Sequence, residues 1–272
     1  MMSGCYHGVN AWCQKKGNPG ILDDEVKNNI FIEFNNFELL EKTVLEHPGE
    51  IASVISMPYH HTTFSDNIIP ESGYWKNVRR LCANNGIVLI FDDVRAGFRM
   101  DFNGSDHYFG IKADLITMGK AVANGYNISV LCGRDSLRNA VESVTYTGSY
   151  WMSAVPMAAL IATIKKLKSI DAVAYMQNIG KTLTDGLVDI AKNNGFELKV
   201  SGLPSLFFLR IADPANSSFW HQDWIAEMVR RGVYITHYHN MFTNCSMTAK
   251  DLDYTFDAAD ETFKVVKERY RL

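Results

Sequence analysis

The sequence is poor in the features that mark secreted, membrane and metal-binding proteins. Its five cysteines are odd in number and form no C-x-x-C pair, so neither a disulfide framework nor a zinc site is predicted. No apolar run approaches the roughly 20 residues of a membrane span. The opening MMSGCYHG has neither the basic n-region nor the apolar h-region of a signal peptide. We therefore expect a cytoplasmic protein with no membrane association.

An excess of charge of either sign is also missing. Lys and Arg total 27 against 30 for Asp and Glu, which gives a formal net charge of -3. The chain therefore lacks the excess of positive charge that is typical of nucleic-acid-binding proteins. Small molecules are therefore the expected ligands. With 47% hydrophobic and 21% charged residues, the 272-residue chain is long enough for one large domain and a smaller one.

Two close histidine pairs are the remaining candidates for a metal site. His60 and His61 are adjacent, and adjacent residues of an extended segment point to opposite faces, which does not suit a ligand pair. His237 and His239 have same-face spacing, but no carboxylate or thiol partner is evident in the sequence. We predict no metal site.

The most informative stretch runs from residue 87 to residue 120. Residues 87–91 (IVLIF) are a short apolar run followed by Asp92, which is typical of a buried parallel strand. A second apolar run, residues 115–118, ends at Gly119 and Lys120. Ligands bind at the carboxyl ends of such strands, so an acid and a lysine at two strand tips suggest a cofactor site. Taken alone, an acid such as Asp92 after an apolar strand more often caps the following turn.

Several motifs that follow one another along the chain decide between a cofactor site and a turn cap. They are GCYHG at 4–8, FDDVRAGFR at 91–99, YFG at 108–110, ADL at 113–115, MGK at 118–120, GS at 148–149 and MAA at 157–159. Together they resemble class III aminotransferases, and especially glutamate-1-semialdehyde aminomutase and its relatives. The likeness extends over nearly the whole chain.

The resemblance implies both a fold and a reaction. The implied fold is α/β: a large pyridoxal-phosphate-dependent transferase domain of the aspartate aminotransferase type with a mainly parallel sheet, and a small α+β carboxy-terminal domain. We place the large domain at residues 1–167 and the small one at 168–272. The implied activity is that of an aminotransferase or aminomutase, which moves an amino group between an amino donor and a carbonyl acceptor. The sequence does not separate these two reactions or identify the substrate.

The resemblance also assigns roles to particular residues. Lys120 would hold pyridoxal 5'-phosphate as a Schiff base, and Asp92 would keep its pyridine nitrogen protonated. Tyr6 would stack on one face of the ring with His7 beside it, and Val94 would pack on the other face.

One further motif of the family concerns the quaternary structure. Gly148 and Ser149 correspond to a turn that reaches the cofactor phosphate of the neighbouring subunit, with Ser149 in place of threonine. This motif implies a homodimer with its sites at the interface.

The sequence departs from the family in three places. Met57 and Pro58 follow the predicted strand 51–55, where relatives have Glu-Pro, and Asp93 replaces a glutamate. Relatives also carry a segment before the Y-H-G motif that holds the cofactor phosphate at a helix start. We expect the chain to be either a fragment of a longer enzyme or a shortened relative.

Parts of the sequence are also compatible with two other functions. An acidic strand end also occurs in P-loop NTPases, but Gly119-Lys120-Ala121 lacks the required Ser or Thr and the earlier glycine. A truncated, non-catalytic member of the aminotransferase fold, acting as a partner subunit, stays open as an alternative.

Alternating strands and helices are predicted around these motifs. Helices are expected at 36–47, 73–85, 153–167, 171–193, 220–231 and 249–270, and further strands at 127–133, 198–200 and 206–211.

Overall fold

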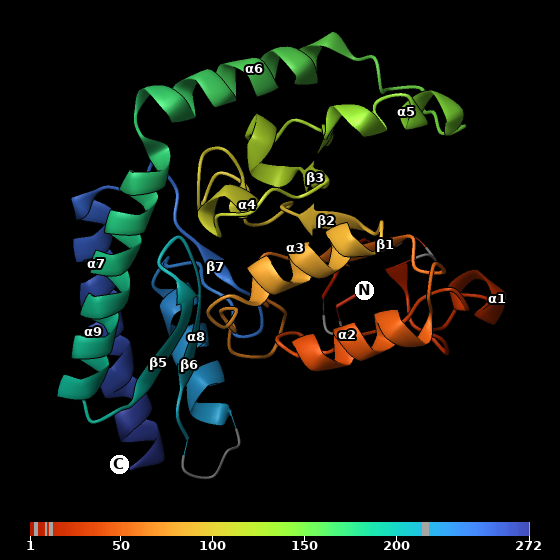
Figure 1. The fold of residues 1–272 in the computed structure, drawn as a ribbon. Coiled ribbons are helices and arrows are strands. Elements are labelled where there is room, and N and C mark those ends of the chain that lie inside the picture. The colour runs from red at the N-terminus through yellow and green to blue at the C-terminus, as the bar shows by residue number, and fades with distance from the viewer. Residues whose placement is uncertain (3–4, 9, 11–12, 214–217, 272) are drawn as a thin grey trace. The chain divides into compact units, whose positions relative to one another are not determined.

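The structure, a computed structural model, describes residues 1–272 with the exception of 3–4, 9, 11–12, 214–217 and 272 (Figure 1). The chain forms two compact units. The first unit comprises residues 1–60 and 69–169, and the second comprises residues 61–68 and 170–272.

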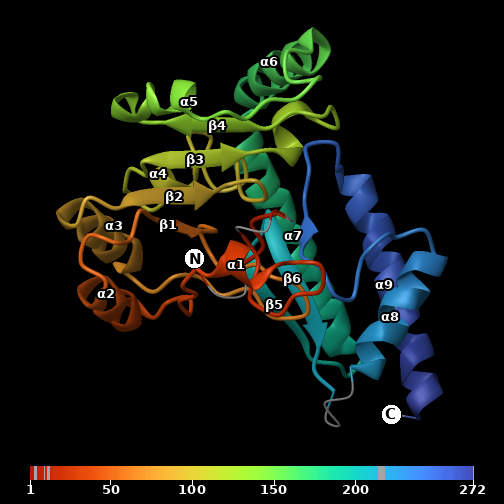
Figure 2. The same cartoon turned by 90° about the vertical axis from the view of Figure 1, so that its right-hand side faces the viewer.

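The first unit is built on a four-stranded sheet in the order β1-β2-β3-β4 (Figure 2). β1 (Ser53–Ser56), β2 (Val88–Asp92) and β3 (Leu115–Met118) are parallel, and β4 (Val130–Gly133) pairs with β3 in the antiparallel direction. The predicted α/β class with a mainly parallel sheet is therefore confirmed. Because β2 and β3 are parallel neighbours, their carboxyl ends lie at one edge of the sheet.

The interior of this unit forms around β2. Leu89 and Phe91 of this strand are fully buried. Trp75, on helix α3 (Tyr74–Asn84), packs on Phe91 with 4.5 Å between ring centroids. Val78, three residues later on the same helix face, is also fully buried. Burying each of these side chains contributes about 1.5–3 kcal/mol, so the strand that ends at Asp92 is held firmly.

Helix α2 (Phe37–Glu46) contacts α3 in the same unit (Figure 1). Its first turn is capped by Asn36, whose side chain accepts a hydrogen bond from the Leu39 N–H at 2.9 Å. Such a cap gives a partner to one of the first backbone N–H groups, which have no acceptor within the helix, and stabilises the helix by about 1 kcal/mol.

Helix α6 (Ala154–Ser169) anchors the turn that follows β3. This turn is a 3-10 helix, Lys120–Ala123, whose Val122 and Ala123 are buried. Leu160 and Ile164 of α6 pack against them. The residues immediately after Lys120 are therefore held by apolar contacts.

The other elements of the first unit are short. They are α1 (Asp23–Val26), α4 (Ser105–Tyr108), α5 (Ala140–Ser143) and a 3-10 helix at Asp135–Leu137.

The second unit combines an antiparallel sheet with three helices. The sheet has the order β5 (Leu198–Leu203), β6 (Leu206–Ile211) and β7 (Met241–Phe242). The helices are α7 (Ala172–Asn193), α8 (Phe219–Arg230) and α9 (Ala249–Tyr270), of which α7 and α9 lie side by side (Figure 1). The core of this unit is dominated by large side chains: Leu209, Trp224 and Phe263 are fully buried.

Residues 61–68 belong to the second unit although they lie far from it in sequence. The buried Asn67 side chain donates to the carbonyls of Ser201 and Leu206, both at 3.3 Å, and accepts from Asn240 at 2.7 Å. Asp66 accepts two hydrogen bonds from the Arg210 guanidinium. These bonds attach the segment to β5, β6 and the stretch before β7.

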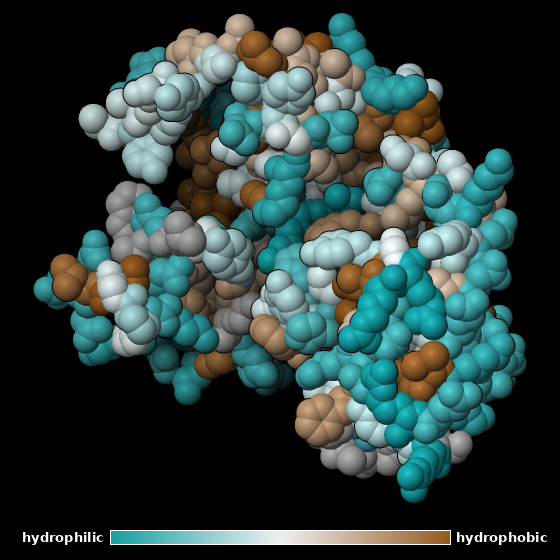
Figure 3. Space-filling model, turned by 180° about the vertical axis from the view of Figure 1, so that it is seen from behind, coloured by the Kyte–Doolittle hydropathy of each residue, from teal (hydrophilic) through white to brown (hydrophobic). Residues whose placement is uncertain are grey.

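Hydrophilic residues cover most of the face shown in Figure 3, with hydrophobic side chains set among them in small groups. Among the residues that the structure describes, no helix is both long and apolar enough to cross a membrane.

Candidate active site

Asp92 lies at the end of β2 and is nearly buried, with 7% of its surface exposed. Its Oδ1 accepts hydrogen bonds from the Val94 N–H at 3.2 Å and from the Thr117 hydroxyl at 3.4 Å. Thr117 lies directly opposite Asp92 on β3. A carboxylate held by donors from its own turn and from the adjacent strand has a fixed orientation.

The His7 side chain contacts the other oxygen of this carboxylate. Its Nδ1 lies 2.6 Å from Asp92 Oδ2, and only 1% of the His7 side chain is exposed. The His7 Nε2 atom is buried and has no hydrogen-bond partner within the described ranges. The two residues are 85 positions apart in sequence, so the fold alone brings the Y-H-G motif to the tip of β2.

Lys120 lies at the neighbouring strand tip. It directly follows Gly119 after β3, and its backbone is in the left-handed region with φ of 46°. Burial is the main cause that lowers the pKa of Lys120; the charge of Arg95 lowers it further, and Asp92 raises it. The amine therefore carries a proton less firmly than an ordinary lysine does.

Val94 and Tyr6 complete the group of predicted residues near these tips. Val94 lies over Gly119: a Cβ atom on that glycine would be 3.5 Å from Val94 Cγ1. Tyr6 is 54% exposed and lies close enough to Arg95 for its phenol to act on the pKa of that guanidinium.

Asp93 is a residue of this site whose burial we did not predict. It is 1% exposed and accepts hydrogen bonds from both the N–H and the hydroxyl of Ser105, the first residue of α4. Burial raises the pKa of Asp93 to about 6, against the lowering effect of these hydrogen bonds. The only signal in the sequence was the acid pair Asp92-Asp93: on a strand end, one of two successive side chains must point to the opposite face.

Comparison with known proteins identifies the architecture around this site. The family model of class III aminotransferases matches residues 18–264. The chain belongs to this family. An aminopentol aminotransferase of Sphingopyxis macrogoltabida is 35% identical over 266 residues, which cover 97% of this chain and 62% of the relative. A glutamate-1-semialdehyde 2,1-aminomutase of Caldivirga maquilingensis is 30% identical over 92% of this chain and 61% of the relative.

Solved structures of the family agree with the fold. The internal aldimine form of the FumI protein of Sphingopyxis sp. MTA144, with pyridoxal phosphate, superimposes with a TM-score of 0.94 at 32% identity, over 99% of this chain and 65% of that one. A transaminase with bound pyridoxal phosphate has a TM-score of 0.86 at 22% identity and shows the fold alone. The chain spans about three fifths of the length of the curated relatives that it matches.

The family motif at Gly148 and Ser149 lies in an exposed turn of the first unit. Gly148 is packed against Trp151, since a Cβ atom on the glycine would be 2.4 Å from Trp151 Nε1. Tyr146, Tyr150 and Trp151 are 64%, 87% and 52% exposed. A hydrogen bond from the Trp151 N–H to the Gly148 carbonyl closes this turn. The structure thus gathers Tyr6, His7, Asp92, Val94 and Lys120. Gly148 and Ser149 form no hydrogen bond or ion pair with this group within the described residues. Gly4, the first glycine of the Y-H-G motif, lies outside the described residues.

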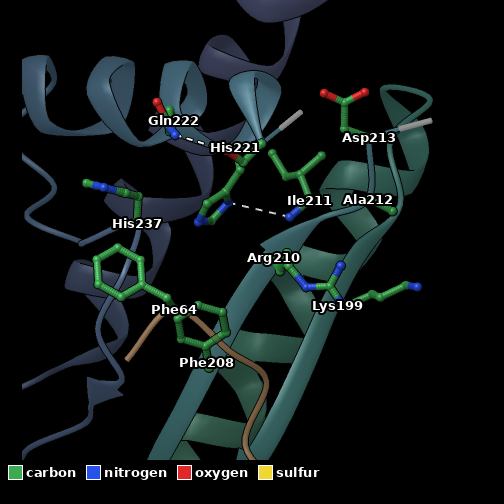
Figure 4. A pocket seen from close by; sticks show the side chains of 11 residues that line it. Phe64, Lys199, Phe208, Arg210, Ile211, Ala212, Asp213, His221, Gln222 and His237 are labelled. Atoms are coloured by element: carbon green, nitrogen blue, oxygen red, sulfur yellow. Dashed lines mark hydrogen bonds between the residues drawn. The ribbon is translucent and has the colours of Figure 1, made fainter. Parts of the chain in front are cut away.

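A separate cavity of about 410 Å³ lies within the second unit (Figure 4). Phe64 and Phe208 form an apolar side of it, and Arg210 lines it from β6. The Arg210 guanidinium is paired with Asp66 through hydrogen bonds of 3.0 and 2.5 Å, so its charge is already compensated. Burial lowers the pKa of His221 to about 4, which keeps this side chain neutral at neutral pH. The strand tips of the first unit are therefore the better candidate for an active site.

Metal binding finds no support in the part of the chain that the structure describes. No group of three or more His, Cys, Asp or Glu side chains with suitable geometry occurs among these residues.

Proposed function

We propose that this chain takes part in the pyridoxal-phosphate-dependent transfer of an amino group between an amino compound and a carbonyl compound. The observation that carries the proposal is the position of two residues at neighbouring strand tips. Asp92 ends β2 and is in contact with His7, and Lys120 follows β3. Membership of the class III family supports the same reaction class, which includes aminotransferases and aminomutases.

The residues at these tips fit pyridoxal phosphate in their chemistry. A nearly buried carboxylate suits the ring nitrogen, and a primary amine with a lowered pKa suits the aldehyde. Tyr6 provides an exposed aromatic ring for stacking, and Val94 provides an apolar surface beside Gly119. When bound, the cofactor supplies a protonated pyridine ring that acts as an electron sink.

Asp92 would hold the proton on the ring nitrogen. Its orientation is fixed by the Val94 N–H and the Thr117 hydroxyl on one oxygen and by His7 on the other. A carboxylate next to a protonated nitrogen favours the charged form of that nitrogen, whereas a neutral amide supplies no compensating charge.

Lys120 would bind the cofactor and later move a proton. Its amine is a nucleophile only when neutral, and the lowered pKa increases the neutral fraction near neutral pH. When neutral, the same amine could also accept a proton at this strand tip and return it.

We further propose that the first unit is the cofactor-binding domain and that the second is the small domain. The sequence division at 167/168 and the last unit boundary at 169/170 are close to each other, and residues 61–68 are the part of the early chain that joins the second unit. Five free cysteines suit a reducing compartment such as the cytoplasm.

A homodimer with Gly148 and Ser149 turned towards the partner's site is also proposed. It is supported by the exposed aromatic side chains Tyr146, Tyr150 and Trp151 in that turn, because such clusters are typical of interface cores. Sedimentation of the wild type and a Trp151→Ser variant at micromolar concentration tests this proposal. A monomeric wild type that still binds cofactor tightly would contradict the shared site.

The test of cofactor binding is spectroscopic. Purified protein incubated with pyridoxal phosphate should develop a visible absorption band, and Lys120→Ala should lose it. Lys166→Ala, which removes an exposed lysine of α6 in the same unit, is the matched control and should keep the band. Borohydride reduction before proteolysis should leave the cofactor mass on the peptide that contains Lys120. A band that survives in Lys120→Ala, or a wild type that never develops one, contradicts the proposal.

A further inference from the structure

The cavity of about 410 Å³ in the second unit is large enough to hold a small organic molecule. Ligand pockets have volumes of about 300–1,000 Å³, whereas one water molecule takes up only about 30 Å³ of liquid. Every residue that lines the cavity belongs to the second unit. The chemistry of its walls therefore indicates which ligand this unit could bind.

His221, on the first turn of α8, contributes a buried hydrogen-bond donor to this cavity. Only 3% of the residue is exposed, and Figure 4 shows its ring in the middle of the lining side chains. Its Nδ1 accepts a hydrogen bond from the Ile211 N–H at 3.4 Å, so the proton of the neutral ring is on Nε2. Nε2 is buried and has no hydrogen-bond partner among the residues that the structure describes. A buried donor of this kind is stabilised by any molecule that brings an acceptor.

The His221 ring is neutral at neutral pH. Burial is the main cause that lowers its pKa to about 4, and His237 and Arg210 lower it further. The backbone of His237 acts in the opposite direction, so it lies close to the ring, although it is not in hydrogen-bonding geometry with Nε2. His221 therefore offers a neutral N–H group, which pairs with a ligand acceptor such as a carboxylate oxygen.

Two cationic side chains line the same cavity. Arg210 gives two of its five N–H groups to Asp66, so it can still donate to a further acceptor while it stays paired. Lys199 has only a loose partner: its Nζ is 3.6 Å from Glu197, and the two side chains are 47% and 69% exposed. Such a surface pair is weak, so the ammonium group of Lys199 is available to a ligand.

The amino end of α8 adds a partial positive charge. Ser218, the N-cap residue, lines the cavity, and its hydroxyl accepts a hydrogen bond from the Gln222 side chain at 3.0 Å instead of capping the first turn. Asp213 also lines the cavity, but Figure 4 shows its carboxylate pointing away from the His221 ring. The surroundings of His221 therefore favour a ligand with a negative charge.

We propose that this cavity binds a small aromatic carboxylate. The carboxylate would accept a hydrogen bond from His221 Nε2 and gain charge compensation from Lys199 and the start of α8. The ring would lie against the apolar side formed by Phe64 and Phe208. An inorganic anion would leave this apolar side unused, and an uncharged ring would leave the cations unused. The proposal does not depend on Lys120 or on pyridoxal phosphate.

The experiment titrates the whole chain with three probes in the absence of pyridoxal phosphate. Benzoate has a ring and a carboxylate, benzyl alcohol has the ring without the charge, and acetate has the charge without the ring. Calorimetry gives the affinity, and the NMR signal of the His221 ring in histidine-labelled protein shows that the probe is in this cavity. Benzoate should shift this signal saturably and bind roughly tenfold or more tightly than either other probe.

Three variants test the walls of the cavity separately. Lys199→Met should weaken the binding of benzoate and acetate several-fold and leave benzyl alcohol unaffected. Phe64→Leu, at a side chain that is 74% exposed, should weaken benzoate several-fold and leave acetate unaffected. His221→Leu removes the buried donor and should abolish benzoate binding; should it fail to fold, the other two variants decide. Lys192→Met, at an exposed lysine of α7 in the same unit, is the matched control and should bind like the wild type.

Three results would overturn the proposal. If benzoate leaves the His221 signal unmoved, the cavity holds water only. If acetate or inorganic phosphate binds as tightly as benzoate, the cavity is a plain anion site in which the aromatic side has no role. If Lys192→Met weakens benzoate as much as Lys199→Met does, binding reflects the charge of the surface and not this cavity.

Discussion

Replacing Asp93 by asparagine should change how the stability of the first unit depends on pH. Asp93 is buried at the strand tip and accepts hydrogen bonds from the N–H and hydroxyl of Ser105. An asparagine has nearly the same shape. Its amide oxygen can accept from the Ser105 N–H, and its amide nitrogen can donate to the Ser105 hydroxyl. The substitution therefore removes an ionisable group and keeps two hydrogen bonds.

The size of the effect follows from the raised pKa. Burial raises the pKa of Asp93 from 3.8 to about 6. Between these two pKa values, the Asp93 carboxyl is deprotonated in the unfolded chain but protonated in the folded chain. A rise in pH through this range therefore favours the unfolded state, and stability falls. Above pH 6 the loss is complete, and a shift of this size corresponds to about 3 kcal/mol. Asp93→Asn should thus match the wild type near pH 4 and exceed it by up to about 3 kcal/mol near pH 7.5.

Hydrogen exchange followed by mass spectrometry of peptides from β2 reports on the first unit alone. Wild type and variant are compared at about pH 5 and about pH 7.5, so that the chemical exchange rate cancels within each pair. Asp135→Asn, which alters a side chain that is 82% exposed, is the control and should show no such pH dependence. The reasoning is refuted if Asp93→Asn and the wild type differ by the same amount at both pH values.

Three further outcomes are expected. Asp92→Asn should leave the protein folded but reduce turnover by orders of magnitude in an activity assay, and unchanged turnover would show that Asp92 only caps a turn. Gly180→Ala should destabilise the second unit by about 1–3 kcal/mol in urea titrations, because its Cβ atom would be 2.0 Å from the carbonyl oxygen of Pro204. Gly186→Ala on the same helix, which meets only a side-chain ring, should cost less. Asn67→Ala should lower the stability of the second unit by about 2–4 kcal/mol, since several buried groups lose hydrogen bonds; an unchanged thermal midpoint would contradict this.

The strands that carry the candidate site could be predicted because their sequence pattern is local. Residues 87–91 and 115–118 are short apolar runs with clear ends, and the structure has β2 and β3 at nearly these positions. Parallel pairing of such strands brings their carboxyl ends together, which is why Asp92 and Lys120 could be expected at one edge.

Contacts between distant residues could not be predicted in the same way. Nothing in the local pattern shows that His7 touches Asp92, because a single sequence does not reveal which loop folds back onto which strand. The burial of Asp93 depends on the position of Ser105, twelve residues away. The attachment of residues 61–68 to the second unit depends on the Asn67 side chain, and its hydrogen-bond partners lie more than 130 positions further on.

The second unit is discontinuous in sequence, and this has a consequence for any attempt to produce it separately. A fragment that begins at residue 170 would contain Arg210 and Asn240 but lack their hydrogen-bond partners, Asp66 for Arg210 and Asn67 for Asn240. A polypeptide in which residues 61–68 are joined to the amino end of this fragment through a flexible linker would restore these partners. Limited proteolysis of the intact chain near residue 169 should therefore give two pieces that stay associated, because the segment 61–68 remains inserted in the second unit.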